Sequence, residues 1–165
     1  MGKVRIEKTP LEYMGRGLLS KVDFSDTFST TNQENNLREI THLIFNKPPK
    51  WVKWLFSIRN KTVRLFGLKT EMPADYNERF AVGGYIGYFR IFSISDHEIV
   101  LGADDSHLNF RAIVAHNKET LHNIKVITLV QYNNPMGKIY MGIIKPFHLM
   151  VVKRLVKNAY QPTPS

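Results

Sequence analysis

One short stretch of this chain gathers several residue types that can perform chemistry. Asp104, Asp105 and His107 lie within four positions, and Asn109 and Arg111 continue the series at every second position. A carboxylate beside an imidazole orients the ring and favours its charged form, while an arginine binds carboxylates through paired hydrogen bonds. His107 and Arg111 are therefore candidate catalytic residues if their face points into a cavity. On an outer face they form a solvated, polar hairpin end.

His148 is the third candidate catalytic residue, because it follows Pro146 inside a predicted helix. A proline has no N–H, so a carbonyl one turn earlier is left for another donor. His148 could supply that donor, act as an acid–base group in a pocket, or lie at the surface. The spacing of histidines and carboxylates matches no metal-binding pattern, and the chain has no cysteine. We therefore expect neither a metal site nor a cofactor.

The segment that carries the first candidates has the period of a sheet. Apolar residues alternate with polar ones along it, and short turns interrupt it, which predicts an antiparallel meander. The expected strands are residues 85–94, 98–104, 107–116 and 122–132.

One hairpin allows its register to be predicted. If Asp105 and Ser106 form a two-residue turn, Leu101 faces Phe110 on an apolar side of the sheet. The other side then carries His107 and Arg111, with Arg111 close to Glu98. We expect that polar side to face solvent.

A long helix is expected after the meander. Asn134 and Pro135 have the residue types of a helix N-cap and first turn, and helical periodicity continues to about Asn158. Pro146 should kink this helix.

Upstream, a strand near residues 22–29 precedes two helices. Thr31 and Glu34 have the spacing of a capping box for the first. The second runs from Pro49 to about Phe66. Its wide apolar side, which includes Trp51 and Ile58, suits burial against the sheet. Its other side is basic.

Several segments together resemble a family of uncharacterised bacterial domains in the START-like, or polyketide-cyclase-like, helix-grip superfamily. They are Phe45–Val52, Arg59–Asn60, Phe66–Lys69, Gly102–Arg111, Gly137–Tyr140 and Lys145–His148. The resemblance implies an α+β fold in which a curved antiparallel sheet wraps around a long C-terminal helix, with two helices after the first strand. We expect one START-like domain over residues 1–160, and the proline-containing residues 161–165 predict a disordered tail. It implies no reaction, because the family has no assigned activity.

The resulting functional hypothesis is a cavity between the sheet and the last helix that binds an apolar or amphipathic small molecule. The expected lining residues are Leu101, Phe110, Val126, Val130, Tyr140, Ile143 and Phe147. A first alternative is a small enzyme of the cyclase or hydratase type that uses the same cavity.

A second alternative is a peripheral binder of anionic membranes or nucleic acid through the basic helix at residues 49–66. The chain has a formal net charge of +9, no apolar run long enough to span a membrane, and no signal-like N-terminus. We expect a cytoplasmic protein without an obligate nucleic-acid partner. Weak contact with anionic membranes would use Lys50, Lys53, Lys61 and Arg64.

Overall fold

The computed structural model describes residues 2–65 and 72–161, and for positions 55, 56, 59, 62, 63 and 65 it describes the backbone alone. Within these residues the chain is an α+β structure with one sheet. The strands are β1 (Val4–Glu7), β2 (Phe24–Thr30), β3 (Tyr85–Ile86), β4 (Phe89–Ile94), β5 (Glu98–Asp104), β6 (Leu108–His116) and β7 (Ile124–Tyr132). The helices are α1 (Leu11–Met14), α2 (Leu37–Phe45), α3 (Lys50–Leu65) and α4 (Pro135–Lys157).

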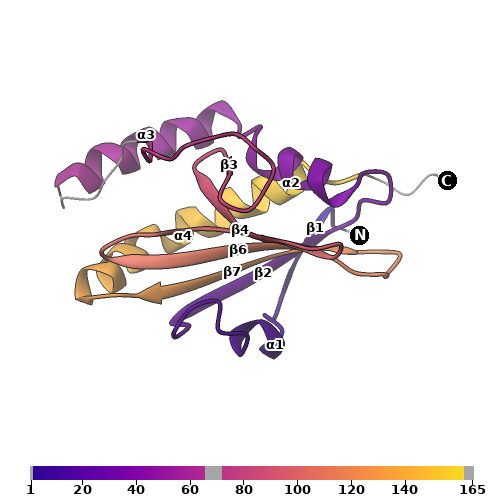
Figure 1. The fold of residues 1–165 in the computed structure, drawn as a ribbon, viewed down its shortest axis with the longest axis horizontal. Coiled ribbons are helices and arrows are strands. Elements are labelled where there is room, and N and C mark those ends of the chain that lie inside the picture. Colours follow the sequence, from indigo (N-terminus) through magenta and orange to yellow (C-terminus); the bar gives the residue numbers. More distant parts are fainter. Residues whose placement is uncertain (1, 66–71, 162–165) are drawn as a thin grey trace.

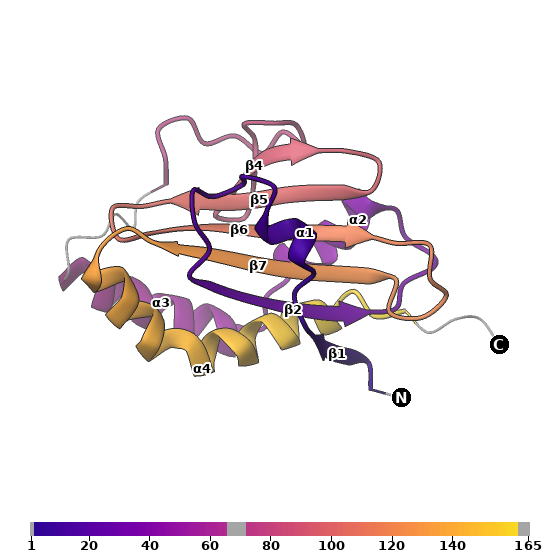
Figure 2. The same cartoon turned by 90° about the horizontal axis from the view of Figure 1, so that it is seen from below.

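The described strands form one seven-stranded antiparallel sheet in the order β1-β2-β7-β6-β5-β4-β3. The strands from β3 to β7 follow one another as a meander, as predicted, but the strand expected over residues 85–94 is two strands, β3 and β4, which pair across a turn at Gly87. Strand β2 then pairs with β7, and β1 pairs with β2 at that edge of the sheet. Helices α2, α3 and α4 lie on one side of the sheet, and α1 lies on the other (Figures 1 and 2). The predicted α+β class, antiparallel sheet and long C-terminal helix are confirmed.

The β5–β6 hairpin shows why the face assignment survives an error in register. Leu101 pairs with Ala112 rather than Phe110, because the turn is Ser106-His107 and the Asp105 N–H bonds the Leu108 carbonyl at 3.0 Å. The predicted turn is therefore wrong by one position, and the pairing by two residues. A shift of two residues keeps every side chain on its own face of the sheet.

The predicted N-cap of α4 is confirmed, and the predicted capping box of α2 is wrong. Asn134 caps α4 by accepting the Gly137 N–H at 3.0 Å, as its sequence predicts. The capping box of α2 is formed by Asn36 and Glu39. Thr31 is not part of it, because its hydroxyl accepts the backbone N–H of His122, in the loop before β7, at 2.9 Å.

The side of the sheet beneath the helices holds two apolar clusters. In the first, Phe28 and Val126 pack against Ile40 of α2 and Leu155 of α4. The second lies toward β4 and includes Ile91, Ile99 and Leu101. Leu101 and Val126 are almost fully buried, so the predicted apolar inner face is confirmed.

The opposite side of the sheet is not the solvated face that the sequence suggested. Tyr13 and Leu19, from the segment that contains α1, cover Ile113, Ile127 and Leu129 on it. Figure 2 shows this segment lying across the strands. The alternation of the strands hid this second core, because β6 and β7 are apolar on both faces over part of their length.

The α3 helix differs most from its prediction. Trp51 is 39% exposed, Ile58 is 41% exposed and Trp54 is 63% exposed, so these side chains are not buried against the sheet. The predicted end of this helix at Phe66 lies outside the described residues. At the other end of the chain, Gln161 donates its N–H to the Thr31 carbonyl at 2.9 Å, and residues 162–165 lie outside the described residues.

Candidate functional site

Arg111 lies on the side of the sheet away from α4 and is tied to its own hairpin. Its guanidinium donates to both carboxylate oxygens of Asp104, at 2.7 and 3.3 Å, and to the Phe110 carbonyl at 2.9 Å. The same group lies over the Phe92 ring at 3.8 Å from its centroid. The predicted neighbour Glu98 pairs instead with Arg16 at 2.7 Å. Asp104 thus occupies the fork that a ligand carboxylate would use.

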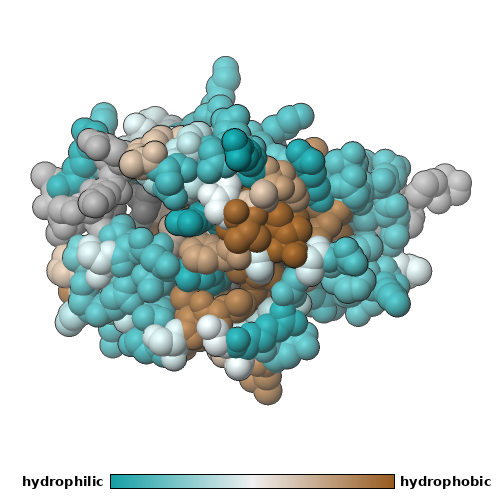
Figure 3. All heavy atoms as spheres, viewed as in Figure 1, coloured by the Kyte–Doolittle hydropathy of each residue, from teal (hydrophilic) through white to brown (hydrophobic). Residues whose placement is uncertain are grey.

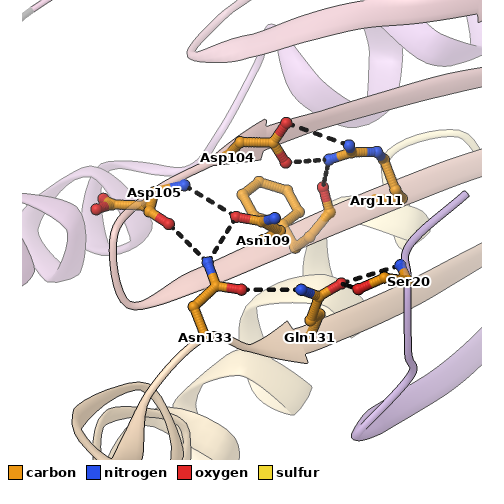
Figure 4. A network of polar contacts seen from close by, with 8 residues as sticks. Ser20, Asp104, Asp105, Asn109, Arg111, Gln131 and Asn133 are labelled. Atoms are coloured by element: carbon orange, nitrogen blue, oxygen red, sulfur yellow. Dashed lines mark hydrogen bonds and ion pairs between the residues drawn. The ribbon is translucent and has the colours of Figure 1, made fainter.

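Side-chain amides continue the polar network at the same end of the sheet (Figure 4). Asn133 donates to the Asn109 side-chain oxygen at 2.9 Å and to the Asp105 carbonyl at 2.7 Å. Gln131 donates to Asn133 at 2.9 Å and accepts from Ser20. These bonds tie the hairpin to the end of β7 and to the N-terminal segment, so their role is to hold the fold together.

His107 lies in the β5–β6 turn, where its ring contacts the N-cap of α4. Its Nδ1 is 3.1 Å from the Asn134 side-chain oxygen and 2.9 Å from the Asn134 side-chain nitrogen. His107, Arg111 and His148 have different partners on different elements, so the structure does not unite the three candidates in one site. Among the residues described, no three histidine or carboxylate side chains come together in a way that could hold a metal ion.

His148 forms a largely buried pair with Asp26, a residue that the sequence did not single out. Its Nε2 lies 2.8 Å from Asp26 Oδ2, and their side chains are 19% and 8% exposed. Phe24 packs edge-on against the His148 ring at 5.9 Å between centroids. The other oxygen, Asp26 Oδ1, is buried without a hydrogen-bond partner. His148 therefore serves neither as the donor to a helix carbonyl nor as a surface residue.

Asp26 could have been found from the alternation of β2. It falls between Phe24 and Phe28, on the face that packs beneath α4. A carboxylate at an apolar position of a strand needs a partner, and a histidine on the covering helix is one that its chemistry favours.

The seven predicted lining residues have unequal environments. Leu101, Val126 and Val130 are buried, and Phe110 and Tyr140 are half-buried. Ile143 is 65% exposed and Phe147 is 50% exposed, on the outer side of α4. None of the seven lines the larger hollow described next, so their role in ligand binding stays a prediction.

A hollow of about 630 Å³ lies between α3 and the β3–β4 turn. Its apolar wall comes from aromatic and aliphatic side chains, and its polar wall comes from α3. The lining residues are Phe45, Asn46, Pro48, Lys53, Ser57, Asn60, Lys61, Arg64, Gly87, Tyr88, Phe89 and Leu155. In the view of Figure 3, hydrophobic residues gather near the middle of the surface and hydrophilic residues surround them.

The local sequence explains both walls of the hollow. Lys53, Lys61 and Arg64 recur on one side of α3 at helical spacing and bring positive charge without a nearby acidic residue of that helix. Gly87 has φ +60°, a conformation that glycine adopts most easily, and this turn carries Tyr88 and Phe89 to the hollow. Of the basic residues predicted for surface contact, Lys50 does not line it.

A second hollow, of about 220 Å³, lies on the α1 side. Tyr13, Arg16 and Glu98 line it, and burial together with the Glu98 carboxylate raises the pKa of Tyr13. Its volume is below the usual range for small-molecule sites. The larger hollow is therefore the better candidate for a ligand.

A family model described as "Protein of unknown function (DUF2867)" matches residues 18–155. The chain belongs to this DUF2867 family. The match covers α2, α3, the strands from β2 to β7 and most of α4, so it includes both walls of the hollow and the Asp26–His148 pair. No curated protein and no solved structure matches the chain. Across the described residues, no helix combines the length and hydrophobicity needed to cross a bilayer.

Proposed function

We propose that this protein binds an anionic, amphipathic small molecule in the hollow between α3 and the β3–β4 turn. The observation that carries the proposal is a volume of about 630 Å³ with an apolar wall on one side and three basic side chains on the other. Sites for small molecules have volumes of roughly 300–1,000 Å³ and combine apolar surface with a few placed polar groups. The amphipathic ligand expected from the sequence is retained, but we place it beside α3 and not between the sheet and α4.

Each wall of the hollow would contact a different part of the ligand. Phe45 and Phe89 pack edge-to-face with ring centroids 5.3 Å apart, and with Leu155 they form a surface for an alkyl or aromatic group. Lys53 and Lys61 are exposed ammonium groups opposite this surface. A carboxylate, sulfonate or phosphate is the group that they would bind.

We also propose that the fold is of the START-like, helix-grip type. A long C-terminal helix packed across one side of an antiparallel sheet supports it. The cyclase or hydratase alternative also stays a prediction. The Asp26–His148 pair supports it as an acid–base group, but neither residue lines the hollow.

The proposal is tested with a fluorescent fatty acid and its methyl ester, which differ only in charge. The acid should bind with a stoichiometry of one. The double variant Lys53→Gln, Lys61→Gln should weaken it by roughly fivefold to tenfold, as expected for two exposed charge contacts. Binding of the methyl ester should change little.

The matched control is Lys8→Gln, Lys118→Gln, which removes the same charge from two exposed lysines away from the hollow. Tyr88→Ser, at a side chain that is 64% exposed, should weaken both probes because it removes apolar wall. Equal effects of the two lysine pairs would show that net charge, and not the hollow, attracts the acid. That result would overturn the proposal.

A further inference from the structure

Helices α3 and α4 lie on the same side of the sheet (Figures 1 and 2), and both leave apolar side chains exposed. On α4, Ile139, Ile143, Phe147 and Met150 are each 49–65% exposed. Their spacing of four, four and three residues places them on one side of the helix. The side of α4 that carries Met141 and Leu155 packs on the sheet, so this outer stripe has no partner within the described residues.

Helix α3 also leaves apolar side chains exposed. Trp54 is 63% exposed, and Trp51 and Ile58 are about two-fifths exposed. The sequence predicted that this apolar side of α3 is buried against the sheet, which would keep it away from a membrane. These side chains are exposed in the structure, so that objection no longer holds. Tryptophan is favoured at the boundary between lipid headgroups and hydrocarbon, because its ring is apolar and its N–H is polar.

The charge of both helices is of one sign. Neither α3 nor α4 contains an acidic residue. The basic residues are Lys50, Lys53, Arg59, Lys61 and Arg64 in α3, and Lys138, Lys145, Lys153, Arg154 and Lys157 in α4. A helix with exposed apolar residues beside lysines and arginines has the composition that binds at the surface of anionic membranes.

We propose that the outer sides of α3 and α4 dock on an anionic lipid bilayer. Charge complementarity selects this partner among those that apolar surface alone would allow. A second copy of the chain would bring two positive surfaces together, which repel each other. A nucleic acid would match the charge but would leave Ile143 and Phe147 without an apolar partner, whereas a bilayer provides both.

The proposal can be tested with the protein's own fluorophores, because its two tryptophans both lie in α3. The protein is mixed with vesicles of phosphatidylglycerol or of phosphatidylcholine, and pelleting and tryptophan emission are measured. We expect binding to the phosphatidylglycerol vesicles, a blue shift of the emission, quenching by brominated acyl chains, and weaker binding as salt increases.

The decisive variant is Ile143→Ser, Phe147→Ser, which alters two exposed side chains outside the core. Vesicle affinity should fall by roughly tenfold or more, since both side chains lose their transfer into lipid. The matched control is Leu11→Ser, Val82→Ser, because these side chains are also exposed, at 76% and 65%, and lie outside α3 and α4. This control should bind vesicles like the unaltered protein.

Three results would overturn the proposal. They are absence of binding to phosphatidylglycerol vesicles at low salt, equal losses in both double variants, and quenching that is missing although the protein pellets. A dimer in solution that the Ile143 and Phe147 changes dissociate would assign the surface to a second copy, and tight binding to duplex DNA without vesicle binding would assign it to nucleic acid. Neither residue lines the hollow, so fatty-acid binding should persist in this variant even if docking is lost.

Discussion

The Asp26–His148 pair offers the sharpest test of how the sheet and α4 are held together. The change is His148→Leu, which removes the ring that lies 2.8 Å from the carboxylate but keeps an apolar side chain of similar size. Asp26 is left with a side chain that is 8% exposed and with Oδ1 already lacking a partner. A buried carboxylate without a partner is costly, so the variant should be much less stable than its size change suggests.

The expected magnitude follows from burial. Removing one partner of a fully buried ion pair costs roughly 3–5 kcal/mol. His148 is 19% exposed and water can reach part of the site, so we expect a loss of about 2–4 kcal/mol in the free energy of unfolding. Replacing both residues, in Asp26→Leu, His148→Leu, should recover much of that loss, because an apolar pair of similar volume suits a position between Phe24 and Phe28 on β2.

The assay is urea unfolding followed by far-ultraviolet circular dichroism, since the tryptophans lie only in α3 and do not report on the sheet. Asp26→Leu completes a double-mutant cycle with the other two variants. The reasoning fails if His148→Leu costs less than about 1 kcal/mol, or if the effects of the two single changes simply add.

Two further predictions concern glycines and pH. Gly137→Ala should lower the free energy of unfolding by about 2 kcal/mol or more, because the added carbon would lie 2.0 Å from the His107 carbonyl oxygen. Gly142→Ala, on the same helix but with open space around it, should raise the free energy of unfolding by about 0.5–1 kcal/mol in the same urea assay. Burial, with help from Arg38, lowers the pKa of His42. The folded state therefore favours the neutral His42 ring. The stability that the neutral ring contributes is fully present above the ordinary histidine pKa of about 6.5, and it is lost as the pH falls below that value. Urea titrations at several pH values should show this slope, and His42→Gln should flatten it; an unchanged slope would contradict the assignment.

The positions of strands and of the last helix could be predicted because their signals are local. Alternation assigned Leu101 and Val126 to the inner face even though the pairing was wrong by two residues. Asn134 and Pro135 marked the start of α4 because a helix cap is completed within its own first turn. The capping residue of α2 was missed because Thr31 has the same local spacing, and only its contact with a distant loop decides against it.

The candidate site depended on contacts between distant parts of the chain. His148 was recognised, but Asp26 is 122 positions away and meets it only because α4 crosses β2 on the inner face of the sheet. Lys53 and Lys61 were recognised as a basic stripe, whereas the aromatic wall opposite them comes from the β3–β4 turn.

By itself, the amino-acid sequence determined the class of the fold, the inner face of the meander and the basic character of two helices, since these follow from periodicity and composition. Tertiary structure alone decided that the N-terminal segment covers the second face of the sheet and that Trp54 and Phe147 stay exposed. The physical reason is that burial depends on which elements meet. The hydrophobic effect favours burial of an apolar side chain against any apolar surface, and the local sequence does not specify which surface will be available.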